Sequence, residues 1–214
     1  MRTATLLFST AIAIAYGAPT TSFEDLKPIE AEVAKGFGKL MADEAAKFDK
    51  PQIKIEADAD KANGAHIPDT IGVLIVPQKD LKESEELAAK FKADRGAPLA
   101  FLFLYRVAPV VNNATVDKSK LRPVKLADEQ GKEHTVHTLL LSVRQVADDD
   151  YRLYAYGYND KPIVDAKFSE RTASGTNPVV VEVKDVDHDK RQGKLVVSVF
   201  GKYQATFTIG HMPD

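Results

Sequence analysis

The sequence of 214 residues contains no cysteine and no tryptophan. The absence of cysteine excludes disulfide bonds, thiol catalysis, cysteine-ligated zinc and the lipid-modified cysteine of a bacterial lipoprotein. Stability must therefore come from packing, and a chain of this length can bury enough surface for one sizeable core. Because many secreted eukaryotic domains depend on disulfides, an exported protein without them is more typical of bacteria.

The sequence also lacks a strong charge excess and a long apolar run. Its formal net charge is −2 at pH 7. Sequence-independent binding to nucleic acid depends on neutralising phosphates, so this charge does not support it. After residue 17 the most apolar stretch is 99–111, which contains Arg106, whereas a transmembrane helix needs about 20 mostly apolar residues. We therefore expect no nucleic-acid partner, and no membrane span after residue 17.

The first 17 residues have the features of an export signal. Arg2 precedes apolar residues within 6–15, a stretch too short to anchor a protein permanently in a bilayer. Ala15 and Gly17 then form an A-x-G cleavage signal. We predict a signal peptide over 1–17 and export to the periplasm or the extracellular space of a bacterium. The alternative is a buried helix or strand at the N-terminus.

A helix is predicted to begin near Pro28, because apolar residues recur at steps of three and four. They are Ile29, Val33, Phe37, Leu40, Met41, Ala45 and Phe48. Gly36 and Gly38 each weaken this helix by about 1 kcal/mol relative to alanine, so we expect close packing or a bend there. Pro51 ends the helix, and the alternation over 52–56 predicts a half-buried strand.

Residues 71–107 have the pattern of a β-α-β unit. The run 71–76 is apolar on both faces, as in a central strand, and 99–107 is a second such strand. Between the two strands we expect a helix with Asp80 as its N-cap residue. Gly96 is expected at the position just after the C-terminus of this helix, where glycine is common.

From about residue 121 the pattern changes to short alternating runs separated by turn residues, which predicts an antiparallel β-meander that curls into a half-barrel or sandwich. The predicted fold class is therefore α+β: an N-terminal helix and one β-α-β unit, followed by the meander. We expect a single domain over 18–214, with a boundary near 109–120 as the alternative.

The sharpest acidic feature is formed by Asp185, Asp187 and Asp189, whose alternating carboxylates suggest a calcium site. An EF-hand loop beginning at Asp185 would need glycine and glutamate where the chain has Lys190 and Val196. The alternative is a solvated hairpin loop without metal. A second loop has similar ligands at similarly loose spacing: Glu56, Asp58, Asp60 and Asn63.

Tyr154, Tyr156 and Tyr158 alternate along a predicted strand and so share one face. A row of phenol rings can stack against sugar rings or a proline-rich peptide, which makes this face a candidate ligand platform. The alternative is that the rings shield the sheet and keep their hydroxyls at its rim.

Motifs for other chemistry are incomplete or missing. His134 and His137 are three residues apart on a predicted strand, so they face opposite sides and would need a bulge to share a metal. The sequence has no G-x-S-x-G, P-loop or G-x-G-x-x-G motif.

The sequence thus predicts an exported, non-enzymatic binding or structural domain whose partner is a protein, a peptide or a glycan. The alternative is a hydrolase or other enzyme that uses clustered carboxylates, with or without a divalent cation. A purely structural component should expose an apolar patch or an unpaired sheet edge.

Overall fold

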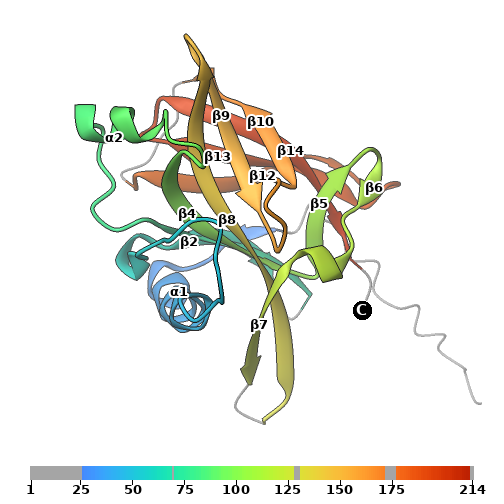
Figure 1. Cartoon of the computed structure of the whole chain (residues 1–214). Coiled ribbons are helices and arrows are strands. Elements are labelled where there is room, and N and C mark those ends of the chain that lie inside the picture. Colours follow the sequence, from blue (N-terminus) through green and yellow to red (C-terminus); the bar gives the residue numbers. More distant parts are fainter. Residues whose placement is uncertain (1–25, 69, 128–130, 172–176, 213–214) are drawn as a thin grey trace, which may run out of the picture.

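The computed structural model describes residues 26–68, 70–127, 131–171 and 177–212. The described chain forms two antiparallel β-sheets that pack face to face, with helix α1 (Ala31–Ala45) across the outer face of the larger sheet (Figure 1). Residues 1–17, the predicted signal peptide, lie outside the described residues. None of the described helices is long and apolar enough to cross a membrane.

The larger sheet has eight strands. In spatial order they are β1 (Lys27–Pro28), β2 (Asn63–Ile67), β3 (Ile71–Pro77), β4 (Ala97–Tyr105), β8 (Glu133–Ala147), β9 (Asp150–Tyr156) and β10 (Val164–Lys167), while β7 (Arg122–Ala127) pairs with the first half of β8.

The smaller sheet has six strands. Their order is β12 (Val179–Asp187), β13 (Gln192–Val199), β14 (Tyr203–His211), β5 (Val107–Val111) and β6 (Ala114–Thr115), with β11 (Ser169–Glu170) paired to β14. Consecutive strands pair antiparallel in β8–β9–β10 and in β12–β13–β14, which confirms the antiparallel meander in an α+β fold.

The two sheets of the sandwich are connected to each other along both edges. On one side β10 leads through Phe168 into β11 and so into the other sheet. On the other side the Asn63 side chain takes the place of a strand partner for β12: its Nδ2 donates to the Val179 carbonyl at 2.8 Å, and its Oδ1 accepts from the Val181 N–H at 3.0 Å. Arg106, with a φ of 54°, marks the point where β4 passes into β5.

Alternate residues of the central strands enter two separate apolar regions. The inner core lies between the sheets and includes Val73, Ile75, Leu102, Leu104, Leu139, Leu141, Leu153, Leu195, Val197 and Ile209. The outer layer lies between α1 and the larger sheet and includes Ala34, Met41, Ala42, Ala45, Leu74, Val76, Phe101, Phe103, Leu140, Tyr154 and Tyr156. This two-sided burial explains why 71–76 and 99–107 are apolar on both faces.

The β-α-β unit predicted for 71–107 is wrong, because β3 and β4 are direct neighbours and antiparallel, with Gly72 opposite Tyr105 and Pro77 opposite Ala100. A β-α-β unit requires parallel strands and a crossover. Apolar faces identify a central strand but carry no information on its direction. The helix between them, α2 (Glu85–Lys90), is short, and its N-cap is Ser84 rather than Asp80, with the Leu87 N–H donating to Oγ at 3.2 Å.

The face that helix α1 turns to the sheet matches the predicted one only in part, at Met41 and Ala45. Its buried residues are Ala34, Gly38, Met41, Ala42 and Ala45, whereas Val33, Phe37 and Leu40 are exposed. Small side chains face inward because the helix lies very close to its support: a Cβ atom at Gly38 would lie 2.8 Å from that of Ala62. Apolar periodicity did not distinguish the small face from the large one.

Candidate functional site

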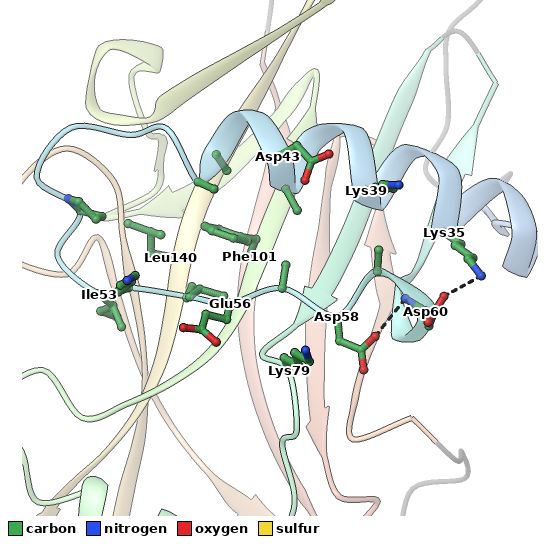
Figure 2. Close-up of a pocket in the computed structure, with 18 residues that line it drawn as sticks. Lys35, Lys39, Asp43, Ile53, Glu56, Asp58, Asp60, Lys79, Phe101 and Leu140 are labelled. Atoms are coloured by element: carbon green, nitrogen blue, oxygen red, sulfur yellow. Dashed lines mark hydrogen bonds and ion pairs between the residues drawn. The ribbon is translucent and has the colours of Figure 1, made fainter.

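A groove of about 600 Å³ runs along α1 on the outer face of the larger sheet. We call it the α1 groove (Figure 2). Its walls are α1 between Lys35 and Ala46 and the segment 51–60, which is extended up to Asp58, with Lys79 at the rim and Phe101 and Leu140 as the apolar floor.

The segment 51–60 is held in place by the burial of alternate side chains and by backbone hydrogen bonds to the sheet. Ile53 and Ile55 are buried in the outer layer, so Lys54 and Glu56 between and after them are exposed. The chain then pairs with the end of β3: the Lys79 N–H donates to the Glu56 carbonyl at 2.6 Å, and the Asp58 N–H donates to the Pro77 carbonyl at 2.8 Å. This wall of the groove is therefore anchored to the sheet.

One end of the α1 groove is closed by an ion pair. Lys35 Nζ lies 2.7 Å from Asp60 Oδ1, and this hydrogen bond lowers the pKa of Asp60 and raises that of Lys35. Asp58 caps the short helix η2 (Ala59–Lys61), since its Oδ1 accepts from the Asp60 N–H at 3.2 Å. These two carboxylates of the second acidic loop are thus already engaged.

The remaining charged groups of the α1 groove are uncommitted. Lys39, Asp43, Lys54, Glu56 and Lys79 line it, and none forms an ion pair with another described residue. The site therefore presents free charges of both signs around an apolar floor.

The three tyrosines of the predicted platform do not share an open face. Tyr154 and Tyr156 are 9% and 2% exposed, and the guanidinium groups of Arg144 and Arg95 lie over their rings at 6.0 and 5.7 Å. Burial raises the pKa of Tyr156. Tyr158, beyond the end of β9, is 49% exposed and stacks on Arg122 instead.

The acidic hairpin separates its carboxylates and pairs two of them with lysines. Asp185 Oδ2 lies 3.0 Å from Lys194 Nζ, and Asp187 Oδ2 lies 2.8 Å from Lys190 Nζ. The hydrogen bond from Lys190 lowers the pKa of Asp187, and Asp189 lies in the turn between β12 and β13. Within the described ranges no three acidic or histidine side chains are placed to hold one metal ion.

The two histidines of the H-x-x-H pair are separated as the strand period predicts. The Tyr105 hydroxyl and His134 Nδ1 are 3.2 Å apart. His137 is 7% exposed, and its buried Nδ1 has no hydrogen-bond partner among the described residues. Burial, and to a smaller extent the positive charge of Lys118, lowers the pKa of His137.

Sequence reasoning missed Arg122, which is 3% exposed. Its guanidinium lies between the rings of Phe48 and Tyr158 and donates to four acceptors in two separate segments: the carbonyls of Asp49, Lys50 and Gly157 and Oε1 of Gln52. It thereby fixes the turn from α1 into the groove wall. The available signal was its spacing of two from Val124, which places both on the buried face of β7.

No known protein-family model matches the chain, and comparison with curated proteins and with solved structures finds no match.

Proposed function

We propose that the protein is an exported, non-enzymatic binding domain whose α1 groove holds an extended peptide segment. The observation that carries this proposal is the set of uncommitted charges of both signs around an apolar floor. A groove of about 600 Å³ is also in the usual range for ligand sites.

A peptide suits this lining better than the other partners considered. It brings apolar side chains for the exposed lining residues Ala46 and Pro51, and carboxylates and amines for Lys79 and Glu56. A glycan would need open aromatic faces, but arginines cover the rings of Tyr154 and Tyr156.

The alternative proposal, a hydrolase or other enzyme with clustered carboxylates, has less support. A carboxyl that acts as a general acid near neutral pH needs a raised pKa. Among the described residues each carboxyl with a shifted pKa has it lowered by a hydrogen-bond donor: Asp60, Glu86, Asp117, Asp150 and Asp187. If calcium bound the acidic hairpin, thermal unfolding in calcium and in EDTA would differ, and replacing Asp187 and Asp189 by asparagine would abolish the difference.

The binding proposal is tested with a variant that fills the groove. Ala46 is exposed and lines it, so Ala46→Trp should block the groove without disturbing the core. The probe is a fluorescein-labelled peptide in which valine alternates with lysine and glutamate, followed by fluorescence anisotropy. We expect Ala46→Trp to weaken binding roughly tenfold, and Ala89→Trp, on the exposed surface of α2, to leave it unchanged.

Equal affinity of the two tryptophan variants, or no binding by the unmodified protein, would contradict the proposal. Maltohexaose as a competitor separates a glycan site from a peptide site, since it should not displace the labelled peptide. Export is tested separately by measuring the intact mass of the secreted protein. The secreted chain should begin at Ala18, and a mass that still includes residues 1–17 would contradict cleavage after Gly17.

A further inference from the structure

The segment 51–60, one wall of the α1 groove, is bonded to the sheet through alternate residues. Glu56 uses both of its main-chain groups for this: its carbonyl accepts from the Lys79 N–H at 2.6 Å, and its N–H donates to Oε1 of Gln78 at 2.9 Å. The Asp58 N–H donates to the Pro77 carbonyl at 2.8 Å. Glu56 and Asp58 therefore direct main-chain groups towards the end of β3.

Ile55 and Ala57 direct their main-chain groups the opposite way, towards α1. The chain is extended here, and successive residues of an extended chain present N–H and C=O to opposite edges. Helix α1 runs along one side of the segment, and Lys79 lies on the other (Figure 2). Both residues line the groove, and none of their main-chain groups forms a hydrogen bond with a described residue. We call these two N–H and two C=O groups the open edge.

No described residue completes the open edge. Helix α1 lies across the groove from it, but the main-chain groups of a helix are bonded within the helix. Lys39 and Asp43 line the groove from α1, and neither side chain is bonded to the open edge. Ile55 is only 6% exposed, and main-chain polar groups at buried positions are nearly always paired. A strand edge without partners is a template for pairing with another chain.

We infer that the peptide in the α1 groove binds by strand addition, with its extended main chain between α1 and the segment 51–60 and paired to Ile55 and Ala57. Residues two apart on one edge supply the donors and acceptors that a strand partner needs. The inference rests on the proposed function and deepens it, because it names the recognised chemistry as the peptide main chain.

Main-chain recognition determines what the groove requires of a peptide. Alternate side chains of an added strand face the groove floor and the solvent. The side chains that face the floor are selected for size and apolar character, whereas those that face the solvent are tolerated broadly. A peptide that is helical when bound should not fit, because its N–H and C=O groups are already bonded to each other.

Backbone methylation of the labelled peptide tests strand addition. Two isomers of the valine, lysine and glutamate peptide are compared by fluorescence anisotropy, one N-methylated at the valines and the other at the charged residues. Each methylation removes donors from one edge of the peptide only. The valines hold the peptide in one register, because a slip by one residue would turn the charged side chains to the floor.

One isomer should bind at least roughly tenfold more weakly than the other, since about two hydrogen bonds are lost. Ile55 is buried against the sheet, so the valine isomer should lose affinity if the peptide lies antiparallel to the segment, and the other isomer if it lies parallel. Equal affinity of the two isomers would overturn strand addition. If Ala46→Trp still weakened binding of the unmethylated peptide, the binding proposal itself would stand. If the unmethylated peptide did not bind, both would be wrong.

Amide hydrogen exchange, followed residue by residue by nuclear magnetic resonance, tests the protein side of the pairing. At saturating peptide the amides of Ile55 and Ala57 should exchange at least roughly tenfold more slowly than in the free protein. Lys54 is the matched control, because its amide also has no partner among the described residues but lies on the opposite edge. Slower exchange at Lys54 without a change at Ile55 and Ala57 would overturn the inference.

Discussion

The two apolar regions on either side of the larger sheet are built by different means. The inner core consists mostly of branched aliphatic side chains from strands of both sheets, and many of them are completely buried. The outer layer combines aromatic rings on the strands with alanine and glycine on α1, and Arg122 closes one end of it. The inner core defines the sandwich, whereas the outer layer positions the helix that forms one wall of the α1 groove.

This difference predicts which part of the molecule a substitution in each region destabilises. A large-to-small change in the inner core should lower the stability of the whole domain. A change in the outer layer should affect the position of α1, and therefore binding, more than the β-sandwich beneath it.

The largest effect should come from Leu102→Ala in the inner core. Leu102 is completely buried on β4, the strand between β3 and β8. The lost burial and the resulting cavity should lower the free energy of unfolding by about 4 kcal/mol. Urea unfolding followed by circular dichroism measures it. A loss below about 1 kcal/mol would show that this part of the inner core is not tightly packed.

Arg122→Met should have a somewhat smaller effect and a different character. Methionine keeps an apolar stem but removes the guanidinium that lies over the rings of Phe48 and Tyr158 and that donates to the carbonyls of Asp49, Lys50 and Gly157. Leaving these acceptors unpaired should cost about 3 kcal/mol.

Leu102→Ala and Arg122→Met should lower stability in different parts of the molecule, and this distinguishes the two variants. In Arg122→Met, amide hydrogen exchange should accelerate in residues 46–52 and in α1 more than in β13 and β14. Uniform acceleration across both sheets would contradict the separation between outer layer and inner core.

The sequence was informative where side-chain alternation alone determines structure. The strand patterns of the C-terminal half predicted the antiparallel meander. The alternation at Ile53 and Ile55 correctly indicated that both side chains are buried, but residues 52–56 do not form the predicted strand. Strand direction was not accessible, because β3 and β4 have the same apolar pattern whether they run parallel or antiparallel.

The candidate site was largely hidden from the sequence. The α1 groove depends on how α1 is rotated and on how close it lies to Ala62, and Gly38 permits that close approach. Apolar periodicity favoured the larger residues Val33, Phe37 and Leu40 as the buried face. Arg122 was missed because its partners are mostly main-chain carbonyls in distant segments, which leave no residue type in the sequence to match.

The smallest predicted effect is a pH dependence of stability that arises from one buried histidine on a strand rather than from the apolar side chains of either region. His137 is buried on β8, and burial lowers its pKa below the ordinary value of 6.5. As pH falls through 6.5 the unfolded chain takes up a proton at this position and the folded chain does not. Stability should therefore be full above about pH 7 and decline as pH falls towards the lower pKa of the folded state.

Urea midpoints measured between pH 7.5 and pH 5 test this assignment, at pH values chosen around the ordinary histidine pKa. His137→Gln should flatten the decline, because glutamine does not titrate. Leu102→Ala is the control: it lowers stability at every pH but keeps His137, so its decline should match that of the unmodified protein. If His137→Gln kept the full decline, the acid sensitivity would have to come from other groups, and the buried Nδ1 of His137 would then have no part in it.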